Sequence, residues 1–278
     1  MRRIKLVIAY DGTNYCGWQT QPTGKSIEDE INKAITGLTG EDVRIIGASR
    51  TDSGVHALGN VAVFDTEARM PGEKFAYAIN QRLPEDIRIV ESEETASDFH
   101  PRRADCTKTY RYSIFSGRIE DPLKRLYTHF CYYPLNLEDM RAGAEILLGK
   151  HDFRSFTNPD SQVLIEGGSS VREIYSIEIE AEHDKDVQRG RGYYGLITIT
   201  IKGNGFLYNM VRIIVGTLLR VGTGLYDPSH VTEILEALDR QAAGPTAPAR
   251  GLCLLGLEYN DTAQKNITEN KIITQTEK

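Results

Sequence analysis

The chain has 278 residues, 40% of them apolar, which is enough to bury a core in one large domain or two small ones. Its formal net charge is −6, so it lacks the basic balance typical of nucleic-acid-binding domains, and bulk charge alone favours a soluble metabolic enzyme. The sequence contains no apolar run near the roughly 20 residues that span a bilayer. Its four cysteines form no C-x-x-C pair, which argues against a zinc ribbon and predicts reduced thiols in the cytoplasm.

The first part of the chain predicts alternating strands and helices. Residues 4–10 are apolar and β-branched and end at an Asp-Gly turn, which predicts a first strand. Ser26 is a candidate helix N-cap, and apolar residues recur behind it at helical spacing as far as Gly40. The other predicted elements are strands at 43–48 and 61–64 around a loop at 49–59, a helix at 72–82 and a strand at 87–90. This order is that of a ferredoxin-like unit.

The second part predicts a similar but larger unit. Residues 171–181 and 194–202 alternate apolar and polar side chains, as antiparallel strands with one solvated face do. The other predicted elements are strands at 107–115, 127–132 and 252–259, a helix from the N-cap Asn136 to Gly149, and helices at 209–221 and 229–238.

These elements define an expected fold class and division of the chain. We expect an α+β fold, with a largely antiparallel mixed sheet built from two ferredoxin-like halves and helices packed on it. The expected N-terminal half covers 1–104 and the C-terminal half covers 105–260. The stretch 261–278 is polar and lacks aromatic residues, which predicts a flexible tail.

Charge is unevenly distributed along the chain. Segments 99–125 and 189–220 carry net charges of +4 and +5, whereas segments 85–98 and 178–186 carry −5 and −4. Aromatic residues lie among the basic ones, a combination that suits a phosphate backbone and stacked bases. A single charged segment is more often a solvated face, so charge alone leaves both interpretations open.

One predicted loop holds an arginine, an aspartate and a histidine within a few residues of each other. Its sequence from Arg50 is Arg-Thr-Asp-Ser-Gly-Val-His. Asp52 could act as a nucleophile, a general base or a metal ligand. Asp-Ser-Gly is also ordinary turn chemistry, because the aspartate bonds its own backbone and glycine tolerates a positive φ. His56 leads into an apolar strand, so we expect it to be packed and hydrogen-bonded.

Residues 202–212 imitate two known motifs. Gly203 and Gly205 between a strand and a helix resemble a dinucleotide-binding turn, but Tyr208 occupies the third glycine position. The same residues imitate the aromatic strand of an RNA-recognition motif, but they lead directly into a helix. Arg212 lies beside the buried stripe of that helix, where it either extends to solvent or pairs with a buried carboxylate.

The strand predicted at 107–115 carries two tyrosines on one face. Tyr110 and Tyr112 share that face, and Arg111 lies on the other. Core packing explains such tyrosines, and so does base stacking beside a basic segment.

Together and in this order, the motifs resemble the tRNA pseudouridine synthase A family. The resemblance covers about residues 5–259. It rests on Tyr-Asp-Gly-Thr at 10–13, Gly-Trp-Gln at 17–19, Arg-Thr-Asp-x-Gly-Val-His-Ala at 50–57, Tyr-Arg-Tyr at 110–112, Asp-Phe-x-Ser-Phe at 152–156, Phe-Leu-x-x-Met-Val-Arg at 206–212 and Gly-Leu-x-Leu at 251–254. Ser49 departs from the pattern, because the family more often has glycine there.

The resemblance implies a pseudouridine synthase fold and an isomerase. The implied reaction breaks the N-glycosidic bond of a uridine in tRNA and rejoins C5 of the base to C1′, without a metal or cofactor. The implied targets are the uridines at tRNA positions 38, 39 and 40 in the anticodon stem-loop. The family further implies a homodimer that binds tRNA, acts in the cytoplasm and has no membrane partner.

The resemblance also implies roles for single residues. Asp52 is the implied catalytic aspartate, Arg212 its partner, and Arg50 the residue that helps to hold the target nucleotide out of the stem. The implied substrate-binding residues are Tyr110, Phe206 and Leu207.

Elementary electrostatics suits this assignment. Burial raises the pKa of an aspartate, and we expect a cation within about 4–6 Å, here Arg212, to reverse that rise. Asp52 would then either attack C1′ or remove the proton from C2′, and the sequence leaves both routes open. We further expect a positive cleft around Asp52 on a negative protein.

Two other functions stay open at this point. A non-catalytic RNA-binding module would use RRM-like halves without turnover. A dinucleotide-dependent enzyme would use the turn at Gly203 and Gly205.

Overall fold

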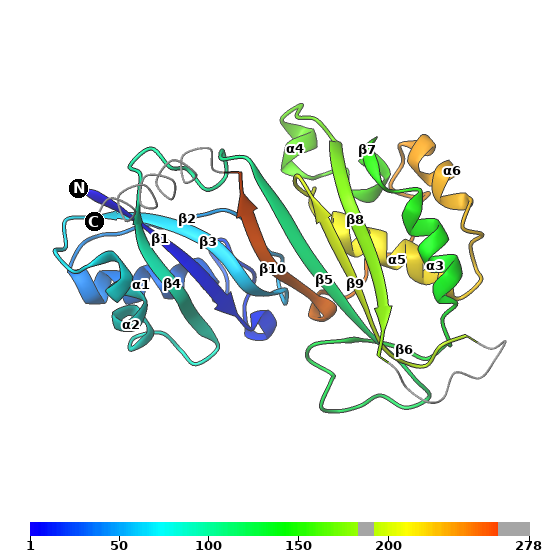
Figure 1. Cartoon of the computed structure of the whole chain (residues 1–278), viewed down its shortest axis with the longest axis horizontal. Helices are drawn as coiled ribbons and strands as arrows, with labels where there is room; N and C mark the ends of the chain where they lie inside the picture. The colour runs from blue at the N-terminus through cyan, green and yellow to red at the C-terminus, as the bar shows by residue number, and fades with distance from the viewer. Residues whose placement is uncertain (183–191, 261–278) are drawn as a thin grey trace, which may run out of the picture.

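The computed structural model describes residues 1–182 and 192–260 (Figure 1). The predicted tail at 261–278 lies outside the described residues, as do the ends of the charged segments 178–186 and 189–220 that fall within 183–191. In the described residues, ten strands form one sheet in the order β4-β1-β3-β10-β5-β9-β8-β7, with β2 paired to β3 and β6 paired to β5. No helix among them is long and apolar enough to cross a membrane.

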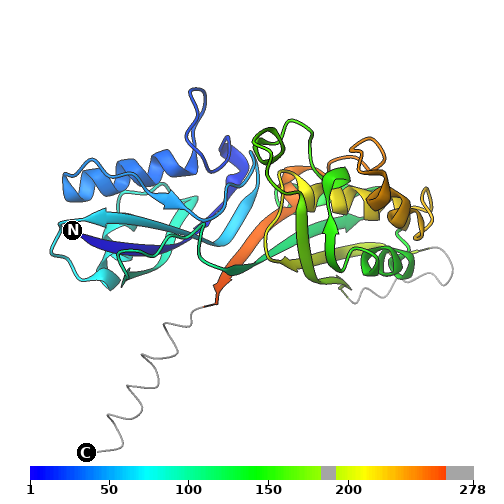
Figure 2. The ribbon, with the colours of Figure 1, turned by 90° about the horizontal axis from the view of Figure 1, so that it is seen from above.

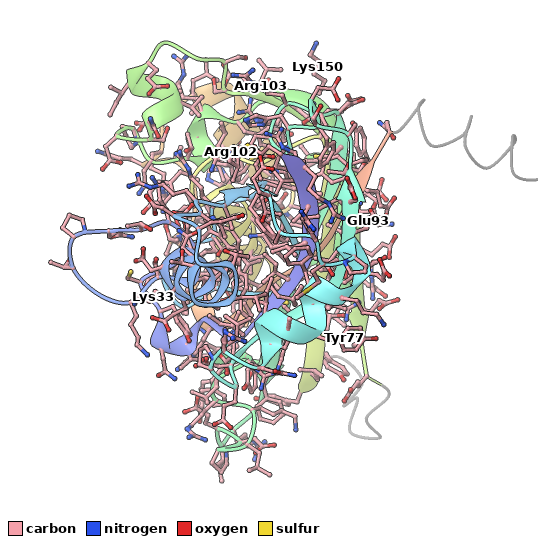
Figure 3. The ribbon with its side chains drawn as sticks, turned by 90° about the vertical axis from the view of Figure 1, so that its left-hand side faces the viewer. Lys33, Tyr77, Glu93, Arg102, Arg103 and Lys150 are labelled. Atoms are coloured by element: carbon pink, nitrogen blue, oxygen red, sulfur yellow. The ribbon has the colours of Figure 1, made fainter. Side chains whose placement is uncertain are left out.

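The N-terminal half packs two helices against its part of the sheet. Its elements are β1 (Arg2–Tyr10), α1 (Ile27–Thr39), β2 (Ile46–Gly47), β3 (His56–Thr66), α2 (Phe75–Asn80) and β4 (Ile87–Thr95). Every second residue of β1 from Ile4 to Tyr10 is buried, and these side chains join the buried residues of α1 and α2 in one core. Figure 3 looks onto this half, where Lys33 on α1 and Tyr77 on α2 point away from it.

The caps of α1 explain why its limits follow from the sequence. Ser26 accepts a hydrogen bond from the backbone N–H of Asp29, and Gly40 ends the helix with a φ of 76°. The side chain satisfies an N–H that the first turn leaves without a helical partner, and only glycine adopts the left-handed conformation at low cost.

The C-terminal half is larger. Its elements are β5 (Cys106–Ser116), β6 (His129–Cys131), α3 (Leu137–Glu145), β7 (Gly149–Asp152), α4 (Gln162–Ile165), β8 (Val171–Ala181), β9 (Gly195–Gly203), α5 (Met210–Gly222), α6 (His230–Ala237) and β10 (Leu252–Tyr259). The long strands β5, β8 and β9 pair antiparallel, and ten residues of α5 are buried, seven of them in the hydrophobic core.

Both halves have the same strand order. Numbering the four main strands of each half along the chain, the spatial order is fourth, first, third, second: β4-β1-β3-β2 and β10-β5-β9-β8. Neighbours within each half are antiparallel. The expected α+β fold with two ferredoxin-like halves is therefore confirmed.

β10 joins the two halves into one sheet. It pairs antiparallel with β5 along most of its length, and its residues Cys253 and Leu254 pair parallel with His56 and Ala57 of β3. Figure 2 shows β10 crossing between the two lobes of the molecule. The start of β3 and the middle of β5 are thereby held on either side of one strand.

Several predicted boundaries differ from the structure. The loop predicted at 49–59 is shorter, because β3 begins at His56. The strand predicted at 43–48 contains only Ile46 and Gly47, since the backbone N–H of Ile45 donates to the Asn32 side chain instead of a strand. The helix predicted to end at Gly149 ends at Glu145. β7 and α4 are short and were not predicted.

Candidate active site

The loop between β2 and β3 carries Asp52, and the segment 12–18 supports it from behind. The backbone N–H of Trp18 donates to the carbonyl oxygen of Thr51 at 3.0 Å. The Thr51 hydroxyl shares a 2.7 Å hydrogen bond with the buried hydroxyl of Tyr10. These bonds fix the backbone immediately before Asp52.

Two glycines allow this close support. Gly17 has a φ of 110°, and a Cβ there would lie 2.7 Å from the Thr51 carbonyl oxygen. A Cβ on Gly47 would lie 2.4 Å from the ring of Trp18, which is fully buried. The Gly-Trp-Gln string therefore serves the packing of the Asp52 loop.

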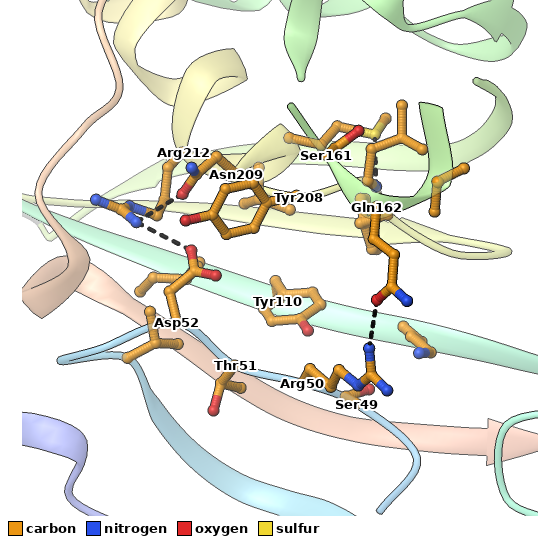
Figure 4. A pocket seen from close by; sticks show the side chains of 18 of the residues that line it. Ser49, Arg50, Thr51, Asp52, Tyr110, Ser161, Gln162, Tyr208, Asn209 and Arg212 are labelled. Carbon is orange, nitrogen blue, oxygen red and sulfur yellow. Dashed lines mark hydrogen bonds and ion pairs between the residues drawn. The ribbon is translucent and has the colours of Figure 1, made fainter. Parts of the chain in front are cut away.

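Asp52 meets Arg212, which is 160 residues away in sequence on the first turn of α5 (Figure 4). Arg212 Nη1 donates to Asp52 Oδ2 at 2.9 Å and to Asn209 Oδ1 at 2.7 Å, and its Nε donates to the Ala247 carbonyl oxygen at 2.8 Å. Three acceptors in different directions hold the guanidinium plane in one orientation. The ion pair joins the two halves of the molecule.

Burial and pairing act on Asp52 in opposite directions. The side chains of Asp52 and Arg212 are 19% and 17% exposed. Burial raises the pKa of Asp52 above its ordinary value, and the hydrogen bond and charge of Arg212 offset only part of the rise. The expectation that Arg212 reverses the effect of burial is therefore wrong. The Asp52 carboxylate is a stronger base than an exposed aspartate.

Tyr110 lies on the floor of the site, on β5 (Figure 4). It is 9% exposed, and Phe206 meets its ring edge-on with the centroids 5.3 Å apart. Burial raises the pKa of Tyr110, and the charge of Asp52 raises it further, so the phenol stays protonated at neutral pH.

Arg50 points away from Asp52 and toward the opposite wall of the site (Figure 4). Its Nη1 donates to Gln162 Oε1 on α4 at 3.0 Å. This hydrogen bond is a second connection between the halves. No sequence pattern singled out Gln162, because α4 has only four residues and none of them is buried, so it lacks the apolar spacing that predicts a helix.

These side chains line one cavity of about 670 Å³ between the two halves. All six predicted site residues line it: Asp52, Arg212, Arg50, Tyr110, Phe206 and Leu207. The cavity also contains residues that sequence reasoning did not single out as site residues: Arg102, Lys108, Gln162, Tyr208 and Asn209. Asn209 could have been predicted as a site residue, because it lies within the Phe-Leu-x-x-Met-Val-Arg motif at 206–212, although the motif does not specify its identity.

The surroundings of the site are more positive than the chain as a whole. Six cations line this cavity and a smaller one beside it: Arg50, Arg102, Arg103, Lys108, Arg172 and Arg212. Four acids line the same two cavities: Asp52, Asp105, Asp160 and Glu166. Of these cations, Arg50 and Arg172 come from neither of the two basic segments, so the positive surface is assembled by the fold.

His56 of the Asp52 loop and Gly203 of the candidate dinucleotide-binding turn both have structural roles. Gly12 N donates to Nδ1 of the buried His56 at 3.1 Å, and His56 Nε2 lies 3.1 Å and 3.2 Å from two backbone carbonyl oxygens. The expected packed, hydrogen-bonded histidine is confirmed. A Cβ on Gly203 would lie 2.7 Å from the Glu173 carbonyl oxygen and 3.3 Å from the ring of Phe206, so Gly203 is explained by packing.

Comparison with known proteins identifies the family. A family model described as tRNA pseudouridine synthase matches residues 6–102 and 144–260. A tRNA pseudouridine synthase A from Acetivibrio thermocellus is 46% identical over 93% of this chain and its own full length. The tRNA pseudouridine synthase A 2 of Clostridium perfringens is 45% identical over the same shares, and the tRNA pseudouridine synthase A of Brevibacillus brevis is 40% identical.

The chain therefore belongs to the tRNA pseudouridine synthase family, a family of isomerases. Its similarity to relatives named tRNA pseudouridine synthase A covers nearly its whole length. Within the chain, Asp52 and Arg212 lie inside the two matched segments, and Tyr110 lies between them.

Proposed function

We propose that this chain converts uridine to pseudouridine in tRNA, at positions 38, 39 and 40 of the anticodon stem-loop. The observation that carries the proposal is the Asp52–Arg212 ion pair, which lies in a cavity large enough for a nucleotide in a member of this family. The proposal includes action as a homodimer in the cytoplasm, and it needs no metal or cofactor.

The reaction is an isomerisation in which no atom is gained or lost. The bond from N1 of the uracil to C1′ breaks, the base turns, and a bond from C5 to C1′ forms. The proton on C5 then leaves and N1 takes up a proton. Asp52 begins this sequence in one of two ways, and both need its ionised carboxylate beside Arg212. In the first, it attacks C1′ as N1 leaves, and the bond from Asp52 to C1′ breaks when C5 attacks. In the second, it removes the proton from C2′ as N1 leaves, and a proton returns to C2′ when the bond from C5 to C1′ forms.

The other site residues receive positioning roles. A uridine inside a stem must leave the stack before C1′ can be reached, which costs a few kcal/mol. Tyr110, with Phe206 and Leu207, provides an aromatic and apolar wall for the displaced base, and such stacking contributes roughly 1–3 kcal/mol. Arg50 at the cavity edge helps to hold the nucleotide out of the stem.

Release of tritium from C5 tests the reaction directly. An anticodon stem-loop RNA labelled with tritium at C5 of its target uridine should lose the label with the wild-type protein and keep it with Asp52→Asn. A matched control is Asp65→Asn, because Asp65 also pairs with an arginine, at 2.7 Å, but does not line the cavity. Intact RNA binding without tritium release by the wild type would favour an RNA-binding module instead.

The dinucleotide alternative has its own test. Titration of a reduced nicotinamide dinucleotide, followed by its fluorescence, should show no binding. A saturable signal that is lost in Gly203→Val would support that alternative.

The proposed organisation of the chain is separately testable. We propose the halves 1–104 and 105–260 as its two domains. For the proposed homodimer, sedimentation at micromolar concentration should give twice the monomer mass of 31.1 kDa. Pseudouridine mapping in tRNA from cells with and without the protein would identify the modified positions.

A further inference from the structure

A second cavity adjoins the one that contains Asp52. Its volume is about 480 Å³, and it is formed by the segment 101–106, the start of β8 and the turn after β9. Arg102, Lys108 and Phe206 line both cavities, so the two share a wall.

The second cavity is strongly cationic. Four basic side chains line it: Arg102, Arg103, Lys108 and Arg172. The segment between β4 and β5 supplies the first two of them (Figure 3). The acidic residue in its wall is Asp105, whose Oδ2 accepts a hydrogen bond from Asn260 Nδ2 at 3.0 Å.

Within the part of the chain that the structure describes, the side chains of three of these cations bond only to main-chain oxygens. Lys108 Nζ donates to the carbonyl oxygen of Ala48 at 3.3 Å, and Arg102 Nε donates to that of Gly47 at 2.6 Å. Arg172 Nη1 donates to the carbonyl oxygens of Ser169 at 2.8 Å and Val171 at 2.7 Å. Across residues 1–182 and 192–260, none of the three has a carboxylate oxygen within the 4.0 Å of an ion pair. Lys108 and Arg172 are nevertheless half-buried.

The arrangement is unfavourable without an anion. Burial lowers the pKa of Lys108, and the charges of Arg102 and Arg172 lower it further. Cations that repel one another while partly removed from water gain stability from an anionic ligand that accepts their hydrogen bonds. A phosphate group has the charge and the oxygens to do so.

We propose that this second cavity, here called the phosphate cavity, binds the phosphodiester group on one side of the target nucleotide. The inference rests on the proposed function, since the base would occupy the neighbouring cavity beside Asp52. The shared wall of Arg102, Lys108 and Phe206 places a base site next to an anion site, which is the arrangement within one nucleotide unit. Binding of the backbone there helps to offset the cost of displacing the nucleotide from its stem.

A neutral backbone link tests the phosphate cavity. Two stem-loop RNAs each carry one methylphosphonate, on the 5′ or the 3′ side of the target uridine, and a third carries it at a distant stem position. Dissociation constants are measured for the wild type and Arg172→Gln. We expect one flanking methylphosphonate to weaken wild-type binding about tenfold, and Arg172→Gln to weaken binding of the unmodified RNA by a similar factor.

Coupling between the two changes is the decisive result. If Arg172 contacts that phosphate, Arg172→Gln should bind the RNA with the flanking methylphosphonate almost as well as it binds the unmodified RNA. The methylphosphonate at the distant stem position should change the affinity of the wild type and of Arg172→Gln by the same factor. A matched control is Arg82→Gln, because Arg82 is exposed, lies outside both cavities and also bonds a backbone carbonyl. Multiplicative losses at both flanking positions would overturn the proposal.

Two further arms keep the interpretation unambiguous. Lys108→Met repeats the cycle should Arg172→Gln fail to fold by circular dichroism. Inorganic phosphate is titrated by calorimetry, and phosphate binding without any coupling to the RNA would mean a free-anion site, which contradicts the proposal. Tritium release by the wild type on the same RNA separates the two proposals, because failure of the phosphate cavity alone leaves turnover intact.

Discussion

A buried carboxylate beside an arginine experiences two opposing effects on its basicity. In this site the effect of burial is larger, so the pKa of Asp52 lies above that of an exposed aspartate although Arg212 is 2.9 Å away. A raised pKa makes the ionised carboxylate a better base and nucleophile than an exposed aspartate, which suits the role proposed for it. The three acceptors around Arg212 hold the cation in one orientation, and in the proposed reaction they would keep it in place while the charge on Asp52 changes.

The raised pKa predicts that Asp52→Asn separates activity from stability. The folded protein binds this proton more tightly than the unfolded chain does, so ionised Asp52 lowers the free energy of unfolding at neutral pH, and this cost disappears as the pH falls through the folded-state pKa. We expect Asp52→Asn to lose about 10⁴-fold or more in rate. Its melting temperature at pH 7 should equal or exceed that of the wild type, and a fall of several degrees would contradict the prediction.

Arg212 predicts the pH dependence of turnover. Its hydrogen bond and charge keep the pKa of Asp52 lower than burial alone would make it. In Arg212→Gln the pKa of Asp52 should therefore rise further, and the acidic limb of the kcat–pH profile should move to higher pH. Arg212→Lys retains the charge but not the planar guanidinium, so its limb should move less. An unchanged acidic limb in Arg212→Gln would show that another group controls it.

At the scale of elements, the site depends on how closely the segment 12–18 approaches the loop before β3. Gly17 and Gly47 permit this approach, and Trp18 fills the space behind the loop. The loop is thus held by packing and backbone hydrogen bonds. A substitution in the segment 12–18 should therefore displace Asp52.

Substitution of Gly17 tests this support. In Gly17→Ala the Cβ would meet the Thr51 carbonyl oxygen at 2.7 Å, so we expect a loss of about 1–3 kcal/mol in stability and about tenfold or more in kcat. The control is Gly40→Ala, since Gly40 also has a positive φ but has open space around it. It should lose about 1 kcal/mol of stability and no kcat in thermal melts and tritium release. Equal kcat losses in both variants would rule out a specific role of Gly17.

The sequence predicts elements well where a local pattern is complete. β8 and β10 occupy the predicted residues, and the caps of α1 set its limits. It fails where tertiary contacts decide: β3 begins inside the predicted loop because its first residues pair with β10, and β7 has only four residues. The helix pattern offered Arg212 as a candidate partner of a buried carboxylate, and the family resemblance identified that carboxylate as Asp52. No pattern in the local sequence indicated that Arg50 contacts Gln162.

At the scale of the whole molecule, net charge and local charge disagree. The chain carries −6, yet the two adjoining cavities gather six cations against four acids from distant parts of the sequence. The first inference from bulk charge, a metabolic enzyme, is wrong because the net value averages over surfaces with different roles.

This distribution predicts a strong salt dependence of RNA binding. Each phosphate contact contributes roughly 0.7 to the slope of log Kd against log salt for single-stranded RNA. With four contacts, Kd should rise roughly 50-fold between 50 and 200 mM salt, measured by filter binding. A Kd that is independent of salt would contradict a phosphate-binding surface around Asp52.

The position of β10 has a consequence for how the protein is made. Within residues 1–182 and 192–260, the strand pairing between the two halves runs through β10 alone, and β10 is the last of the described elements. On the ribosome, the loop with Asp52 is synthesised early and the helix with Arg212 is synthesised late. The strand that joins their two halves into one sheet, at residues 252–259, emerges after both. A nascent chain that still lacks residues 252–259 therefore carries Asp52 and Arg212 without the strand that pairs their two halves, so we expect the proposed site to form only once β10 has emerged.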